Sequence, residues 1–257
     1  MPDGLHLDKF LAAAVFIGAR ISGLMVFCPF LSSSAIAPPV KAALTLVITT
    51  LVYLVQGPAR LSLSGWQWAG VGLSEAVIGL LLGLAANFML EAALFAGQVL
   101  GVQMGYALAS LFDPNTSADT PVLATFEQLA ALLIFLELDV HHWLLRAVVR
   151  SFAYLPPGAM PANFAVVHAL LQAAGGIFLS GLQIAAPALA ATLVADVALG
   201  FLGKASPQMP VLFVGLAVKN LLGLGILLAL MAYWPQAFSD RFARAVGLGE
   251  RLLHLMH

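Results

Sequence analysis

Five ionisable side chains lie inside otherwise hydrophobic stretches, where they could carry charge-based chemistry. They are Arg20, Glu75, Glu91, Asp196 and Lys219. An ionised group at the centre of a lipid bilayer costs at least about 2.5 kcal/mol, so each of them needs a partner or a water-filled surrounding. Such groups form proton or ion relays in secondary transporters, or they pair between helices or subunits. We favour structural pairs, because no two of the acids stand on neighbouring turns of one helix beside a basic residue.

The pair His141 and His142 follows Glu137 and Asp139, a grouping that could bind a metal ion. Adjacent residues on a helix point about 100° apart, however, and neither a nearby cysteine nor an HExxH motif accompanies the histidines. The sequence contains no GxSxG motif, phosphate-binding glycine loop or paired catalytic carboxylates, and Ser151 lacks the neighbours of a nucleophile. It therefore predicts no metal site, no cofactor and no enzymatic activity.

Two series of glycines recur at a spacing of four residues, which places each series on one face of a helix. The longer series is Gly97, Gly101 and Gly105, and the shorter is Gly79 and Gly83. Small residues at this spacing let two helix backbones approach closely, which is how helices associate in membranes. A polar stripe lies beside the longer series and consists of Asn87, Glu91 and Gln98. This face is predicted to contact protein or water rather than lipid.

A polar segment interrupts the hydrophobic stretches in the middle of the chain. It consists of Ser110, Leu111, Phe112, Asp113, Pro114, Asn115, Thr116, Ser117, Ala118, Asp119 and Thr120. Proline within it and directly after it prevents a continuous helix, and its Asp, Asn and Ser residues favour turns. Polar backbone of this kind would be costly in lipid. The segment is therefore either an ordinary surface loop or a loop facing a water-filled lumen.

The amino-acid composition indicates whether the segments that carry these residues lie in water or in lipid. Of 257 residues, 61% are hydrophobic and only 9% are charged, and the mean hydropathy is +0.99. In soluble domains roughly a quarter of all residues are charged. Acidic and basic residues nearly balance, at 12 against 11, so no basic surface is available for nucleic acid. The sequence predicts an integral membrane protein.

Hydrophobic runs separated by short polar breaks predict an all-α polytopic membrane protein, because a helix keeps its backbone hydrogen bonds internal in lipid. The predicted helices are Leu7 to Phe30, Val40 to Val55, Trp66 to Leu111, Pro121 to Leu138, His142 to Leu155, Asn163 to Gly203 with a break at Pro187, and Met209 to Trp234. The third is roughly twice as long as the hydrocarbon core requires. The C-terminal segment, residues 236–257, alternates apolar and charged residues as an interfacial amphipathic helix would.

Taken in order, the motifs of this chain resemble the FliR-type subunits of the flagellar export gate and the SctT-type subunits of virulence type III secretion. The motifs are Arg20-Ile-Ser-Gly-Leu, Pro29, Pro39-Val-Lys41, Glu75 with Gly79 and Gly83, Gly97-Gln-Val-Leu-Gly-Val-Gln-Met-Gly105, Phe112-Asp-Pro114, His142, Ser151-Phe152, Pro156-Pro-Gly158, Ala186-Pro187, Asp196, Pro207-Gln-Met-Pro-Val211 and Lys219. Each motif is short, and their order and spacing carry the resemblance.

The resemblance implies kinked helical hairpins, with a FliP-like part over about residues 1–160 and a FliQ-like part over residues 161–257. It implies a non-enzymatic subunit of the flagellar type III protein export gate, which helps to form and seal a channel for unfolded export substrates. The implied location is the bacterial inner membrane within the flagellar basal body. The implied partners are FliP-type and FliQ-type membrane subunits and FlhB-type and FlhA-type export components.

In that family the region matching Tyr106 to Val122 forms a plug loop in the closed channel, so the resemblance implies a plug at residues 110–120. Contacts within the chain or with other subunits are predicted, from their place in hydrophobic helices, for the polar residues Arg20, Glu75, Asn87, Glu91, Gln98, Asp196 and Lys219. Two alternatives remain open. One is an SctT-type subunit of a virulence secretion system. The other is a small-molecule secondary transporter that uses Glu75, Glu91 and Asp196.

Overall fold

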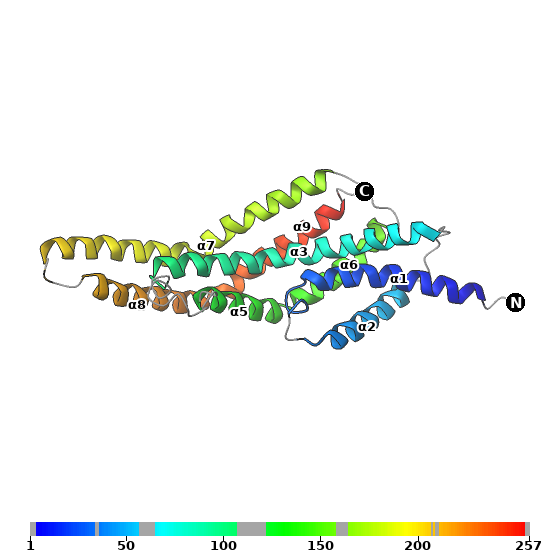
Figure 1. Cartoon of the computed structure of the whole chain (residues 1–257), viewed down its shortest axis with the longest axis horizontal. Helices are drawn as coiled ribbons and strands as arrows, with labels where there is room; N and C mark the ends of the chain where they lie inside the picture. Colours follow the sequence, from blue (N-terminus) through cyan, green and yellow to red (C-terminus); the bar gives the residue numbers. More distant parts are fainter. Residues whose placement is uncertain are drawn as a thin grey trace. The chain divides into compact units, whose positions relative to one another are not determined.

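Every regular element that the structure describes is a helix. The computed structural model describes residues 4–33, 36–56, 65–106, 122–157, 164–206, 208 and 211–254. The helices, drawn in Figure 1, are α1 (Gly4–Phe27), α2 (Pro38–Gln56), α3 (Gly65–Gln103), α5 (Val122–Glu137), α6 (Val140–Tyr154), α7 (Phe164–Ala205), α8 (Val211–Met231) and α9 (Trp234–His254). Within the described residues, four of them, α2, α3, α7 and α8, are long and apolar enough to cross a membrane. The prediction of an all-α polytopic membrane protein is confirmed.

The longest predicted run is shorter in the structure, because a glycine ends it. α3 has 39 residues and is about 58 Å long at 1.5 Å per residue, but it stops at Gln103 rather than Leu111. Gly105 has a φ of 85°, a left-handed conformation that favours glycine. Its N–H donates to the carbonyl of Val102 at 3.1 Å, and the N–H of Tyr106 donates to that of Gly101 at 2.9 Å. These two bonds form a Schellman motif, which terminates the helix.

The predicted break at Pro187 is wrong. α7 runs without interruption over 42 residues, with Pro187 inside it. Proline removes one backbone hydrogen bond, that to the carbonyl four residues earlier, and such losses are tolerated in membrane helices. The long apolar sequence on both sides of the proline keeps the helix continuous.

The chain divides into two compact units, and their limits differ from the predicted FliP-like and FliQ-like parts. The first unit comprises Met1–Phe88, Phe135–Ala173 and Arg241–His257, and the second comprises Met89–Ile134 and Ala174–Asp240. The compact units are defined by packing, and helices distant in sequence can pack together. The FliP-like and FliQ-like parts are defined by similarity along the sequence, so the two divisions need not coincide. The two-part division at about residue 160 stays a prediction.

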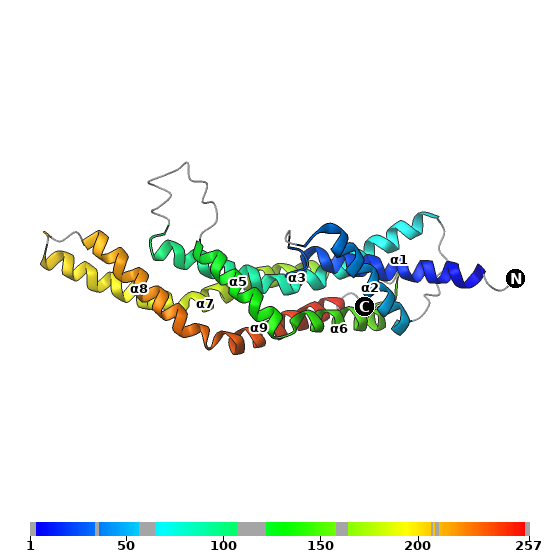
Figure 2. The same ribbon diagram turned by 90° about the horizontal axis from the view of Figure 1, so that it is seen from below.

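The first unit is built on a close crossing of α1 and α3. Gly79 and Gly83 of α3 lie directly against the backbone of α1, where a Cβ atom on Gly79 would overlap the carbonyl oxygen of Arg20. Gly23 of α1 in turn lies against the backbone of Ala76. α2 packs along α1 (Figures 1 and 2). Glycines on both helices therefore bring the two backbones into contact.

In the second unit, glycines on three helices also lie at close contacts, two of them against a backbone and one against a side chain. Gly97 of α3 lies against the backbone of Ala124 on α5, and Gly181 of α7 lies against that of Ala92. Gly223 of α8 faces the side chain of Met104, which is fully buried. Gly101, by contrast, is buried, and no described atom outside its own helix lies within 4 Å of the position of its Cβ. The predicted stripe of three glycines therefore contains one close contact between helices, one buried position without such a contact among the described residues, and one helix end.

Large apolar side chains on several helices remain uncovered by the chain itself. Only 17% of the membrane-length stretch of α8 is buried, against 61% of that of α3. The exposed side chains include Phe213, Leu221 and Leu228 on α8 and Leu54 on α2. Surfaces of this kind contact lipid or other membrane proteins.

The C-terminal segment forms the predicted helix, but it does not present its apolar face to an interface. Phe238 and Phe242 of α9 are buried, and the ring of Phe242 lies edge-to-face with Phe135 at 5.5 Å between centroids. Gly249 lies against Leu82 of α3. The amphipathic pattern reflects packing on the protein, so the interpretation as an interfacial helix is wrong for this face.

We predict that Gly79→Ala and Gly70→Ala, both on α3, have opposite consequences for stability. A methyl group at Gly79 would also lie 2.8 Å from the backbone nitrogen of Leu24, so α1 and α3 must separate, at a cost of about 1–3 kcal/mol. Gly70 is exposed and has no described neighbour at its Cβ position, so a methyl group there raises helix propensity without a clash. Thermal unfolding in detergent should show a lower midpoint for Gly79→Ala and an unchanged or higher one for Gly70→Ala. Equal midpoints would contradict the close crossing.

Candidate functional site

The largest fully buried polar side chain among the described residues is Arg20, in the middle of α1. Its side chain has no exposed surface, and Glu75 of α3 is equally buried. The Nε atom donates to Oε2 of Glu75 at 2.6 Å, and Nη2 lies 2.6 Å from the same oxygen. The sequence prediction of paired charges is therefore realised by a side-on contact between these two helices.

The other donors of Arg20 reach the end of α6. Nη1 donates to Oγ of Ser151 at 2.7 Å, and Nη2 donates to the carbonyl oxygen of Leu155 at 2.9 Å. The guanidinium carbon lies 3.8 Å from the centre of the Phe152 ring, within the range of a cation–π interaction. We call Arg20, Glu75, Ser151, Phe152 and Leu155 the buried arginine cluster.

The contacts of the buried arginine cluster give it a structural role. The cation lies beside the last carbonyl groups of α6, where the helix dipole favours positive charge. Every contact of Arg20 goes to a group of the first unit, and neither Arg20 nor Glu75 is accessible to a solute. The cluster can therefore hold α1, α3 and α6 in register, and it offers no open site for a substrate.

A second ion pair lies between α7 and α8 in the second unit. Nζ of Lys219 is 2.9 Å from Oδ1 of Asp196, and Nε2 of Gln103 donates to Oδ2 of Asp196 at 2.9 Å. A cavity of about 530 Å³ borders these three side chains, and glycines form much of the rest of its wall. The pair is only partly buried, with 17% of the Lys219 side chain and 40% of that of Asp196 exposed.

These two pairs bear on the interpretation of the buried charges. Glu75 and Asp196 each contact an internal cation, so two of the three acids proposed for ion binding are already neutralised. Glu91 and Asn87 are half-buried and engaged in interactions, whereas Gln98 is exposed. Structural pairing therefore explains the ionisable residues better than a relay does.

Sequence reasoning missed one buried acid, Glu127 of α5. It is 1% exposed, and neither carboxyl oxygen has a hydrogen-bond partner among the described residues. Burial raises the pKa of the Glu127 carboxyl to about 8, so the group is protonated at neutral pH. Its signal in the sequence is that no other charged residue occurs between Val122 and Leu136.

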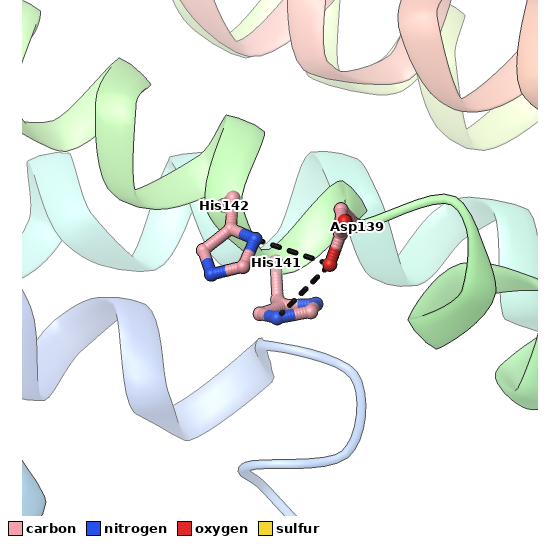
Figure 3. Close-up of side chains that lie close together, drawn as sticks. All are labelled: Asp139, His141 and His142. Carbon is pink, nitrogen blue, oxygen red and sulfur yellow. Dashed lines mark hydrogen bonds and ion pairs between the residues drawn. The ribbon is translucent and has the colours of Figure 1, made fainter.

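The histidines that the sequence singled out lie in the first turn of α6, beside Asp139, which directly precedes that helix (Figure 3). Oδ1 of Asp139 is 3.1 Å from Nδ1 of His142 and 3.7 Å from Nε2 of His141. Burial and the neighbouring His142 lower the pKa of the His141 imidazole, against the opposing effect of Asp139. The predicted plug, residues 110–120, lies outside the described residues.

Comparison with known proteins identifies the family. Residues 11–245 match the family described as "Bacterial export proteins, family 1". The chain belongs to this family. The FliR-type resemblance is confirmed by two flagellar biosynthetic proteins FliR. That of Pectobacterium carotovorum subsp. carotovorum is 35% identical over 231 residues, which are 87% of each chain. That of Escherichia coli (strain K12) is 31% identical over 212 residues, or 82% of this chain and 81% of the relative.

A virulence-type protein is also similar to this FliR-family chain. The surface presentation of antigens protein SpaR of Salmonella typhimurium (strain LT2) is 25% identical over 238 residues, which are 90% of this chain and 86% of SpaR. Its identity is lower than that of the two FliR proteins. These two FliR proteins are therefore more similar to the chain than SpaR is.

We predict that Arg20→Met destabilises this FliR-family chain far more than Arg150→Met does. Removing Arg20 leaves the buried Glu75 carboxylate without its cation, which costs about 3–5 kcal/mol. Arg150 is 66% exposed and lies 3.9 Å from Glu250, a surface pair worth at most about 1 kcal/mol. Thermal unfolding of the two variants in detergent measures the difference. Equal losses would mean that the buried arginine cluster does not support the fold.

Proposed function

We propose that this chain is a non-enzymatic subunit of a flagellar type III protein export gate in the bacterial inner membrane. The observation that carries the proposal is the family match over residues 11–245. The described residues are consistent with such a role, because their deepest ionisable groups form pairs that hold helices together. Passage of an unfolded chain requires a lined channel and a seal, and it requires no covalent chemistry from the subunit.

The uncovered surfaces support assembly with other membrane subunits. The exposed apolar side chains of α8 include Phe213, Leu221 and Leu228, and the exposed amide of Gln98 lies on α3. A helix of another subunit can cover apolar surface of this kind and can accept or donate a hydrogen bond at the amide. FliP-type and FliQ-type subunits are the proposed neighbours, with FlhB-type and FlhA-type components as further partners of the assembled apparatus.

Residues 110–120 are proposed as the seal of the channel. The segment follows the Schellman motif at Gly105, which ends α3 before the polar sequence begins. Polar chain that cannot continue a membrane helix is stable only in water or inside protein. A loop of this kind can be displaced by an exported polypeptide and can then return, so it seals by its volume.

The virulence alternative is the second candidate function, and the similarity to SpaR favours it. Both candidates place the chain in a secretion system of the same type. A small-molecule transporter is disfavoured, since Glu75 and Asp196 are occupied by Arg20 and Lys219.

The function is tested in a flagellated bacterium whose own gene for this subunit is deleted. We expect the intact chain to restore secretion of flagellar proteins and to co-purify with FliP-type and FliQ-type subunits. A chain lacking residues 110–120 should assemble equally well but should admit ions or small solutes, because the seal is gone. Asp113→Asn and Asp119→Asn serve as controls of unchanged volume and should leak little.

Two results would count against the proposal. A chain that is monomeric in mild detergent and restores no secretion is not a gate subunit in that system. Unchanged solute entry after shortening of the loop, with the assembled complex shown to be present, would make residues 110–120 an ordinary connection.

A further inference from the structure

The turn between α5 and α6 contains a carboxylate that does not cap the helix it precedes. Asp139 is the N-cap of α6, and its side chain makes no capping hydrogen bond. Aspartate at this position usually accepts a bond from a backbone N–H in the first turn. Here φ is 54°, a left-handed conformation. The backbone carbonyl of Asp139 accepts from the N–H groups of His142 at 2.9 Å and Trp143 at 3.4 Å, whereas the carboxylate contacts the imidazole of His142, with Oδ1 3.1 Å from Nδ1.

The freed carboxylate lies beside two imidazole rings (Figure 3). The centroids of His141 and His142 are 4.2 Å apart, and one nitrogen of each ring and one oxygen of Asp139 lie within 4.8 Å of one another. Ligands at about 2.0–2.1 Å from a tetrahedral zinc ion are about 3.4 Å apart. The observed distances from Oδ1 to the two nitrogens, 3.1 and 3.7 Å, bracket that value.

The divergence of adjacent histidines, which argued against a metal in the sequence, is overcome by the use of different ring atoms. His141 approaches Asp139 with Nε2, the far nitrogen of its ring, and His142 approaches with Nδ1, the near one. The two rings leave the helix in different directions, yet their nitrogens reach the same carboxylate oxygen. The left-handed backbone conformation of Asp139 lets its carboxylate approach the same point as the two nitrogens.

We propose that Asp139, His141 and His142 form a binding site for a divalent transition-metal ion, with Zn²⁺ as the best match. Two imidazole nitrogens and one carboxylate oxygen are a donor set that zinc accepts, and the fourth position remains open to water or to a group of another protein. All three residues belong to the first unit and to one local turn. The site would join the end of α5 to the first turn of α6, whatever the chain exports.

The surroundings of His141 set the strength of the site. Binding through Nε2 places the ring proton on Nδ1, and Nδ1 is buried without a hydrogen-bond partner among the described residues. Metal-binding histidines normally donate this proton to an acceptor, and loss of that acceptor costs about 10–100-fold in affinity. We therefore expect a micromolar dissociation constant rather than the tighter binding of structural zinc sites.

The test is Zn²⁺ binding to the full-length chain in detergent, co-purified with its membrane partners, by equilibrium dialysis and elemental analysis. The variants are His141→Ala and Asp139→Asn, because asparagine tolerates the left-handed turn. The matched control is His168→Ala, an exposed histidine that bonds only to Gln172 in the described residues. We expect one equivalent of Zn²⁺ in the wild type and control, and at least tenfold weaker binding in both cluster variants.

Replacement of Zn²⁺ by Co²⁺ gives an independent readout, because tetrahedral coordination produces visible absorption that a loosely held ion lacks. Helical circular dichroism and gel-filtration profiles identify any variant that fails to fold, and the Asp139→Asn result then decides. Equal Zn²⁺ affinity in all four proteins, or no binding by the wild type at micromolar concentrations, would overturn the proposal.

Discussion

A guanidinium group buried among apolar helices must satisfy its hydrogen-bond donors inside the protein, and this constraint organises the first unit. Arg20 meets it with a carboxylate of α3, a hydroxyl of α6 and the carbonyl of Leu155 at the end of α6. Each partner must stand at one position along its helix, since a shift of one turn, about 5.4 Å, would lose the bond. The polar cluster therefore sets the register of helices whose apolar surfaces alone would allow several registers.

The glycines make this register sterically attainable. Gly79 lies one turn beyond Glu75 on α3, and it touches the backbone of Arg20 itself. Close approach and ion pairing thus occur at the same point of the crossing. The second unit repeats the combination on a smaller scale, where Asp196 and Lys219 pair beside the glycine-lined cavity. Fixed registers suit the role of a gate subunit that we propose for this chain.

The sequence predicted the fold class and the need for paired charges because both follow from the cost of polarity in lipid. It could not predict that Arg20 also reaches Ser151 and Leu155, because contacts over 131 and 135 residues depend on tertiary packing. Gly105 illustrates a further limit. Its spacing matched a helical stripe, but its backbone conformation ends the helix. α7 shows the opposite error, because a break was predicted at Pro187 and the helix continues through it.

Central to this account is the claim that Arg20 and Glu75 stabilise the fold as a pair. A double-mutant cycle with Arg20→Met, Glu75→Leu and the double variant measures their coupling directly. Each single change leaves one charge buried alone, so the account predicts that the double variant unfolds at a higher temperature than either single variant. Additive losses, with the double variant less stable than both, would contradict it.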